Sequence, residues 1–170
     1  MRFVLGALLL VAATCRAPSG VSASTSPNYQ AMRLSWAAYL HAKALDSAID
    51  QYAVDAVFVT TRGQRIVGSA AIRKLFAEVM KEYNATISLH PDESRTSGQE
   101  GYDSGRFDEV LIVRKTGAAQ REQGKYITIF RHEPSGRWLI VKQSWFRAQS
   151  LSPGQRKMLR PYHHTPTLDG

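Results

Sequence analysis

The chain has 170 residues, of which 44% are hydrophobic, and it carries a net charge of +8. This length supports one hydrophobic core rather than two, so we expect a single domain. The basic residues are dispersed, with no phosphate-binding loop and no nucleic-acid-binding motif. The composition therefore does not favour nucleic acid as a partner.

The first 23 residues have the pattern of a secretory signal peptide. Arg2 provides a positive charge, residues 3–13 form an uncharged, mostly apolar run, and Val-Ser-Ala (21–23) offers small residues for cleavage before Ser24. The apolar run is too short to cross a bilayer as an ordinary helix, so we expect no transmembrane segment in the mature chain. Cleavage would lower the net charge from +8 to +6, because 20 basic and 14 acidic residues would remain. We expect a secreted or periplasmic protein.

The single cysteine leaves a second interpretation of this segment open. Residues 11–15, VAATC, look like a bacterial lipobox, in which Cys15 would carry a lipid anchor, although Thr14 and Ala12 are unusual residues at their positions. If cleavage instead follows residue 23, the mature chain has no thiol. Its stability would then come from core packing and not from a disulfide.

Residues 24–30 are predicted to form a flexible lead-in, and three helices are expected after it. The first should run from Ala31 to about Ala44, because apolar residues recur there at helical spacing: Met32, Trp36, Tyr39 and Leu40. Asp46 can cap a short second helix, in which Ile49 and Tyr52 share a face. The third helix should begin at an N-cap, Ser69, and present a continuous apolar stripe of Ile72, Leu75, Phe76, Val79 and Met80.

Strand-like runs lie between and after these helices. The β-branched residues 56–61 predict a strand that turns back into residues 65–68. Another strand is predicted at 86–89, before a polar loop at 91–98.

The stretch from Tyr102 to Trp145 contains three long strand-like runs. Glu-Pro-Ser-Gly (133–136) predicts a tight hairpin between the last two, which should pair antiparallel. Gly105 interrupts the first run and indicates a bulge that bends the sheet. Residues 148–170 follow as a basic C-terminal tail. The order of elements predicts an α+β fold with helices on one face of a curved sheet.

Three segments resemble the nuclear transport factor 2-like superfamily, and within it the small bacterial SnoaL-like domains that often carry a secretion signal. They are DSAIDQYAVDAVFVTTRGQRIVGSAAIRKLF (46–76), YDSGRF (102–107) and GKYITIFRHEPSGRWLIVKQSW (124–145). The resemblance implies one domain over residues 31–147. It implies a cone-shaped, curved antiparallel sheet with three N-terminal helices packed on its concave face. It is specific for fold and not for function, because this fold hosts isomerases, cyclases, dehydratases and binding modules.

The ketosteroid isomerases of this superfamily use a tyrosine, an aspartate base and a second, protonated aspartate. Matching the segments DAVFVTT and YITIFR places these groups at Trp36, Thr60 and Thr128. An indole donates a hydrogen bond but cannot accept one, and threonine does not ionise near neutral pH. The resemblance therefore implies that ketosteroid isomerase chemistry is absent.

The resemblance also implies a space between the helices and the sheet, lined mainly by aromatic side chains. A flat, largely apolar ligand would fit such a lining, and a few hydroxyl and amide groups would orient it. The alternative is that these side chains only fill the core. The expected lining residues are Trp36, Tyr52, Phe58, Thr60, Phe76, Tyr126, Thr128, Phe130, Gln143 and Trp145.

Two functions remain open on this sequence. The first is an exported module that binds a small hydrophobic ligand or a partner. The second is a SnoaL-like enzyme of the isomerase, cyclase or dehydratase type, with Asp103 as a candidate base for acid-base chemistry. We expect no cofactor and no metal, since the adjacent His163 and His164 have no acidic or cysteine ligand at a useful spacing.

A homodimer is also expected. Lys125, Ile127, Ile129 and Arg131 should face away from the helices, with Trp138, Ile140 and Lys142 of the next strand on the same side. An outer face with branched apolar residues needs a cover, and in the resembling family a second subunit commonly provides it. We predict that the dimer interface centres on Ile127, Ile129 and Ile140.

Overall fold

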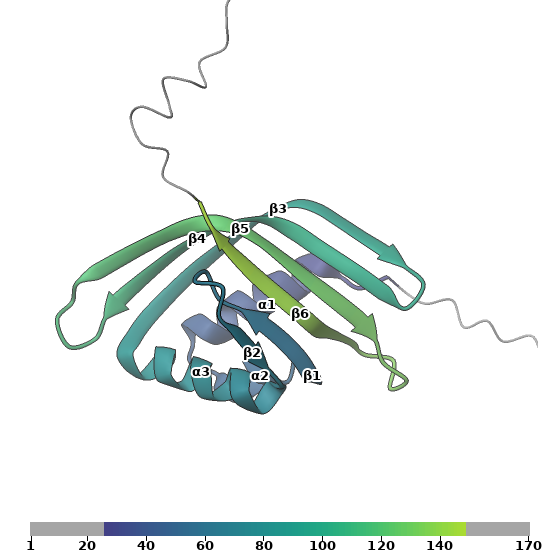
Figure 1. Cartoon of the computed structure of the whole chain (residues 1–170), viewed down its shortest axis with the longest axis horizontal. Helices are drawn as coiled ribbons and strands as arrows, with labels where there is room; N and C mark the ends of the chain where they lie inside the picture. Colours follow the sequence, from purple (N-terminus) through teal and green to yellow (C-terminus); the bar gives the residue numbers. More distant parts are fainter. Residues whose placement is uncertain (1–25, 149–170) are drawn as a thin grey trace, which may run out of the picture.

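The computed structural model describes residues 26–148 and shows an α+β domain of three helices and one six-stranded sheet (Figure 1). The signal segment with Cys15 and nearly all of the C-terminal tail lie outside these residues. The elements are α1 (Tyr29–His41), α2 (Leu45–Ile49), β1 (Tyr52–Val59), β2 (Arg65–Val67), α3 (Ser69–Glu82), β3 (Tyr83–Ser97), β4 (Glu100–Val113), β5 (Ala119–His132) and β6 (Trp138–Arg147).

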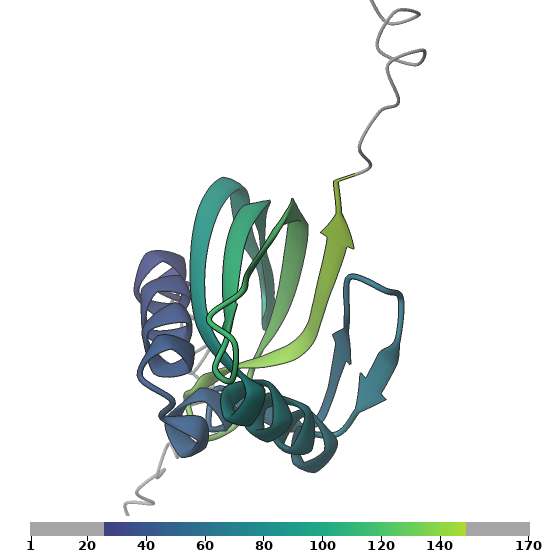
Figure 2. The same cartoon turned by 90° about the vertical axis from the view of Figure 1, so that its left-hand side faces the viewer.

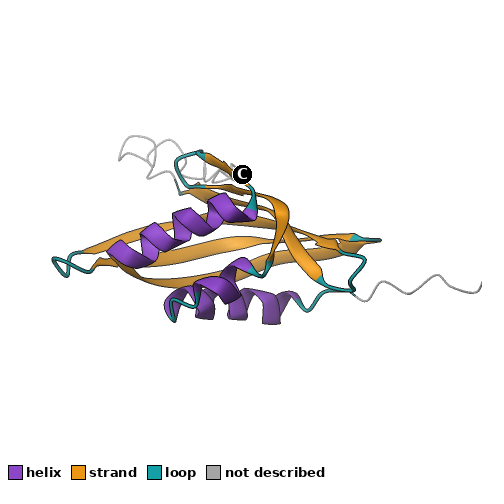
Figure 3. Ribbon diagram, turned by 90° about the horizontal axis from the view of Figure 1, so that it is seen from below, coloured by secondary structure: helices purple, strands orange, loops and turns teal. Residues whose placement is uncertain are grey.

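The strands are ordered β2-β1-β6-β5-β4-β3, and the sheet arches over the helices without closing on itself (Figure 1). Four neighbouring pairs are antiparallel, and β1 pairs with β6 in parallel. Figure 2 shows α1 beside β3 and α3 across the end of the sheet near β1 and β2. Seen from below, the helices lie on the concave face (Figure 3). The predicted α+β cone is confirmed.

The helix ends differ from the prediction. Helix α1 begins at Tyr29, inside the expected lead-in, because the Asn28 side chain accepts a hydrogen bond from the Ala31 N–H at 3.0 Å. Asp46 was expected to cap α2 but lies in its first turn. Ser69 is the first residue of α3, and its cap is Gly68, whose φ of 88° suits glycine.

Residues 91–97 of the predicted polar loop (91–98) form a strand. It continues β3, which pairs with β4 along its whole length. Pro91 is tolerated because β3 is an edge strand, and the register shifts between Pro91 and Glu93. Gly105 lies opposite this bulge, where a Cβ atom would come within 2.1 Å of the His90 carbonyl oxygen. The close approach of two backbones therefore requires glycine at this position.

Aromatic side chains from helices and strands form the centre of the core. Phe76 of α3 packs edge-on against Trp36, Tyr52 and Phe58, at centroid distances of 5.4–6.3 Å. Tyr52 was expected to lie on the short second helix, but it is the first residue of β1. Two residues of the predicted α3 stripe, Ile72 and Phe76, are buried. The stripe therefore faces the core as its spacing predicted.

A second register shift changes which residues of β6 face inward. Ile129 pairs with Lys142, whereas the next residue, Phe130, pairs with Ile140. One β6 residue is thus unpaired, and Ile140 faces the core with only 2% of its surface exposed. The prediction that Ile140 and Trp138 face outward was wrong, because a strict two-residue period cannot cross a bulge.

Candidate functional site

A cavity of about 320 Å³ lies between α3 and the concave face of the sheet. Ligand sites in proteins commonly range from about 300 to 1,000 Å³ and have mainly apolar walls. Helices α1 and α3 form one wall, with Trp36, Leu40, Leu75, Phe76, Val79 and Met80. The sheet forms the other, with Phe58, Tyr83, Ala85, Ile87, Glu109, Leu111, Gln120, Glu122 and Trp145, and the segment after β1 adds Thr60, Thr61, Arg62 and Gln64.

Half of the residues expected from the sequence line this cavity: Trp36, Phe58, Thr60, Phe76 and Trp145. The others are buried in the same domain but do not form the cavity wall: Tyr52, Tyr126, Thr128, Phe130 and Gln143. The interior is therefore divided into a packed region and an open region.

Trp145 carries a buried donor without an acceptor. Its ring packs against Phe107 at 4.4 Å and Trp36 at 5.6 Å, which leaves it 5% exposed. Its indole Nε1 has no hydrogen-bond partner within residues 26–148. A buried donor left unpaired costs about 1–3 kcal/mol, so this N–H lowers the stability of the folded protein.

Two glutamates on adjacent strands are neighbours in the cavity wall. Glu109 of β4 pairs directly with Glu122 of β5, so their side chains lie on the same face of the sheet. Thr61 donates a hydrogen bond to Glu122 at 3.2 Å, and Arg147 forms an ion pair with it. Within the described chain, the Glu109 carboxylate has neither kind of partner. Burial, followed by the negative charge of Glu122, raises the pKa of Glu109 to about 7.

This pair was not predicted from the sequence. Period-2 alternation places Asp103, Phe107 and Glu109 on one face, and that signal was available from β4 alone. The position of Glu122 opposite Glu109 depends on the register of the β4–β5 hairpin, whose connecting loop (114–118) gave no clear indication of strand pairing. The pair becomes visible only in the folded sheet.

Asp103, the candidate base, lies in a different part of the interior. It is 0% exposed and accepts hydrogen bonds from Arg33 Nη1 at 2.5 Å, Ser94 Oγ at 2.5 Å and Tyr126 Oη at 2.9 Å. It does not line the cavity. Burial and the Asp103 charge raise the pKa of Tyr126, so the phenol stays protonated and donates. This geometry links α1 to β3, β4 and β5 and favours a structural role for Asp103.

A second buried hydrogen-bond chain joins α1 to the sheet. Trp36 Nε1 donates to Tyr52 Oη at 2.9 Å, and Tyr52 donates to Gln143 Oε1. Burial raises the pKa of Tyr52, which keeps the phenol neutral. The indole N–H of Trp36 is therefore already occupied, unlike that of Trp145.

Neither a membrane span nor a metal cluster occurs among residues 26–148. No helix in this range is long and apolar enough to cross a membrane. No group of three or more His, Cys, Asp or Glu side chains there could hold a metal ion. His163 and His164 lie outside the described residues.

Comparison with solved structures identifies the fold as that of the nuclear transport factor 2-like superfamily. A superfamily member from Salmonella enterica serovar Typhimurium has a TM-score of 0.66 at 16% identity, over 74% of this chain and 92% of that one. A ketosteroid isomerase-like protein from Erwinia carotovora has a TM-score of 0.63 at 14% identity, over 73% and 94%. An NTF2-like protein with a cystatin-like fold from Novosphingobium aromaticivorans has a TM-score of 0.59 at 15% identity, over 76% and 85%. No family model and no curated protein matches the sequence.

The ion pair of Asp103 predicts a large effect of removing its partner. Arg33→Met should destabilise the protein by about 3–5 kcal/mol, because it leaves a buried carboxylate without a counter-charge. Arg73→Met is a matched control: its pair with Asp46 is exposed, and we expect a loss of about 0–1 kcal/mol. Urea unfolding measures both. Equal losses of unfolding free energy in the two variants would show that Asp103 does not need Arg33 as a counter-charge.

The environment of Glu109 predicts a pH-dependent stability. Its folded pKa of about 7 exceeds the ordinary value of 4.5, so the folded state retains a proton that the unfolded state releases. The free energy of unfolding should therefore fall as pH rises from about 4.5 to about 7. Glu109→Gln should be more stable than wild type at pH 8, whereas the exposed control Glu78→Gln should not. A carbon-13 NMR titration of Glu109 with a midpoint near 4.5 would contradict this.

Proposed function

We propose that the protein binds a small, mainly apolar molecule in the cavity beneath α3. The observation that carries this proposal is a cavity of about 320 Å³ whose sides are mainly apolar and include the aromatic rings of Trp36, Phe58 and Trp145. The surrounding aromatic rings favour a flat ligand body.

Binding is favoured over ketosteroid isomerase chemistry by what lines the cavity. The two matched positions in its wall, Trp36 and Thr60, carry no carboxylate. The indole of Trp36 donates to Tyr52, and the Thr60 hydroxyl accepts from the Gln64 N–H at 3.2 Å. Neither group can act as the isomerase base.

The binding site can be tested by filling the cavity. Val79→Trp adds an indole to the α3 wall and should abolish binding while the protein stays folded. Val54→Trp, at a position 83% exposed, is the matched control. Native mass spectrometry of protein purified from its own host should show a retained small molecule in wild type and in the control only. Equal retention by Val79→Trp would place the ligand elsewhere.

The second candidate function is a SnoaL-like enzyme that uses acid-base chemistry. It is supported by Glu109, since a carboxyl group with a pKa near 7 exchanges protons readily at neutral pH and lies in the cavity wall. Glu109 is better placed for this role than Asp103, which has no access to the cavity. Conversion of the retained ligand by wild type but not by Glu109→Gln would favour an enzyme.

We further propose that the protein is exported. The support is the signal-like segment 1–23, with lipid anchoring through Cys15 as the alternative. Mass analysis of the exported protein decides between them. A mature N-terminus at Ser24 is expected, and a lipid-modified Cys15 would contradict it.

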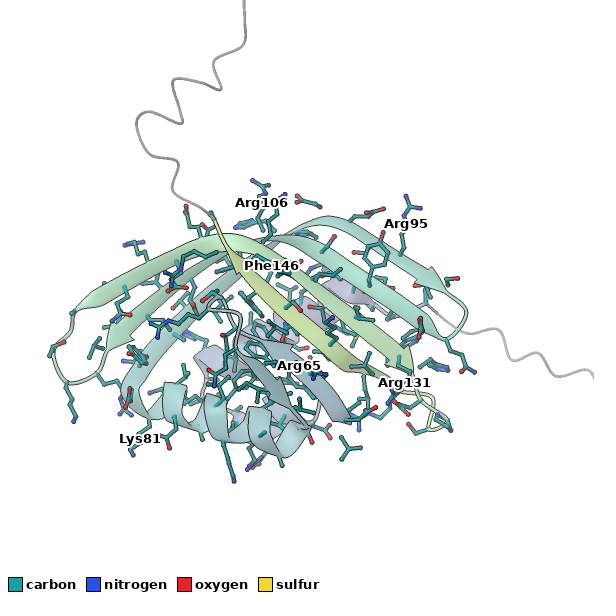
Figure 4. All side chains as sticks on the ribbon, viewed as in Figure 1. Arg65, Lys81, Arg95, Arg106, Arg131 and Phe146 are labelled. Carbon is teal, nitrogen blue, oxygen red and sulfur yellow. The ribbon has the colours of Figure 1, made fainter. Side chains whose placement is uncertain are left out.

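We also propose that the outer face of the sheet forms a homodimer interface. Ile127 and Ile129 of β5 lie on this face, and the register puts three exposed or half-buried apolar residues beside them: Val57, Val67 and Phe146. Arg95 and Arg106 project from the same side of the arch (Figure 4). Apolar side chains at the centre with charges around them suit a two-fold interface.

The basic side chains on the outer face limit how two subunits can pack together. Arg131 is paired with Asp55 and Glu133 within its own subunit, so it adds little repulsion. Lys125 and Lys142 form no ion pair among the described residues. Lys142 lies between Ile129 and Val57 on this face, so a dimer must leave its ammonium group in water or pair it with an acidic side chain of the second subunit. With Ile140 buried, the centre of the interface moves to Ile127, Ile129 and Val57.

A single charge at this centre should separate the subunits. Ile129→Glu is expected to give a folded monomer, because two carboxylates near the two-fold axis repel each other and lose water. Glu109→Gln, which changes the opposite face, is the control and should remain dimeric. Sedimentation velocity measures both. A wild-type monomer at micromolar concentration would contradict the proposal.

A further inference from the structure

We infer that the molecule bound in the cavity carries a positively charged nitrogen, which is held by the carboxylates of Glu109 and Glu122. This inference rests on the proposed binding function and specifies the chemical class of the ligand: an apolar, preferably aromatic body with an ammonium group. Two features carry it. They are the direct opposition of two carboxylates in the cavity wall and the lack of a counter-charge for one of them.

The first feature is unfavourable for the empty protein. Side chains at directly opposed positions of antiparallel strands have Cβ atoms about 4.5–5.5 Å apart, and like charges there repel each other. Both glutamates are also partly buried in a wall shared with Leu111, Ile87 and Trp145, where their carboxylates are less well hydrated than at the surface. A cation bound between the carboxylates would remove both penalties.

The second feature shows which carboxylate lacks a partner. Glu122 is neutralised by Arg147 of β6 and receives a hydrogen bond from Thr61. Glu109 has no such neighbour, and burial together with the charge of Glu122 raises its pKa, which favours a proton on this carboxyl in the empty protein. An ammonium group would take the place of that proton.

The other charged and titratable groups of the cavity do not provide this cation. Arg62, in the segment after β1, is exposed and forms no ion pair within residues 26–148. Tyr83, at the start of β3, contributes a phenol, and Gln120 of β5 is uncharged. Apart from Arg147, already engaged by Glu122, no basic group contacts the pair.

The walls favour an organic cation over a metal ion. The two carboxylates have no third His, Cys, Asp or Glu ligand beside them within residues 26–148, and the cavity offers mainly apolar side chains where a metal ion would need further oxygen ligands or water. Aromatic rings attract ammonium groups through their π-electrons, and Trp36, Trp145 and Phe58 line the same space. An arylalkyl amine satisfies the carboxylates and the rings together.

A matched pair of probes tests the inference: 4-phenylbutylamine and 4-phenylbutan-1-ol. They have the same apolar body and differ in charge. Their binding is followed by the fluorescence of Trp36 and Trp145 and by NMR shifts of residues around Glu109. Aliphatic ammonium groups lose their proton only near pH 10, so between pH 5.5 and pH 8 only the protein changes its charge.

At pH 8, where Glu109 is ionised, the amine should bind about tenfold more tightly than the alcohol, which corresponds to about 1.4 kcal/mol. At pH 5.5 Glu109 is protonated, and the ratio should fall toward one. Glu109→Gln should bind the alcohol as wild type does but lose the preference for the amine at both pH values. The matched control Glu78→Gln, on the exposed side of α3, should keep it.

Three results would overturn the inference: equal affinities for the two probes at pH 8, a preference that persists in Glu109→Gln, or a preference that grows as pH falls. Binding of the alcohol without a preference for the amine would leave the proposed binding function intact. Failure of both probes to bind wild type at any pH would contradict that function, and the inference with it.

Discussion

The sheet has three shifts of strand register, and its concave face depends on two of them, one in β3 between Pro91 and Glu93 and one in β6 beside Val141. A bulge adds one residue to one strand of a pair, which bends the sheet and increases its twist. The first shift lies opposite Gly105, where the backbones of β3 and β4 come too close for a side chain. The second turns Ile140 toward the helices. This curvature gives α1 and α3 a surface to cover and leaves a cavity beneath α3.

The two regions of the interior differ in which polar groups are left unpaired. Near α1 two polar networks are satisfied: Asp103 has Arg33, Ser94 and Tyr126, and the Trp36, Tyr52 and Gln143 side chains form a chain, although the buried Gln51 Oε1 beside α1 has no partner among the described residues. In the cavity wall, the Trp145 N–H and the Glu109 carboxyl have no hydrogen-bond partner among the described residues. Unpaired polar groups therefore occur in both regions, and what distinguishes the cavity wall is a carboxyl group without a partner.

Local pattern was sufficient to predict the fold but not all of its register. The α3 stripe, the hairpin at 133–136 and the inward face of β5 follow from spacing and turn chemistry, which act over a few residues. The strand at 91–97 was missed because its polar composition is typical of a loop and its pairing with β4 is a tertiary effect. Ile140 was misplaced because nothing in a two-residue period indicates a bulge. Trp145 and Thr60 were predicted to line a cavity, whereas the Glu109–Glu122 pair required the β4–β5 register.

The carboxyl groups of this chain lie at other positions than those expected for a ketosteroid isomerase. The resemblance to ketosteroid isomerases places carboxylates at Thr60 and Thr128, where this chain has uncharged hydroxyls. The structure instead places two carboxylates toward the other end of β4 and β5, at Glu109 and Glu122. Thr128 pairs with Asp103 in the packed region, so a carboxylate at position 128 would add a second buried charge next to Asp103. Restoring a carboxylate at position 128 would therefore disturb the buried ion pair of Asp103 with Arg33, which joins α1 to the sheet. Charge near the cavity is better tolerated at position 122, where Arg147 neutralises it.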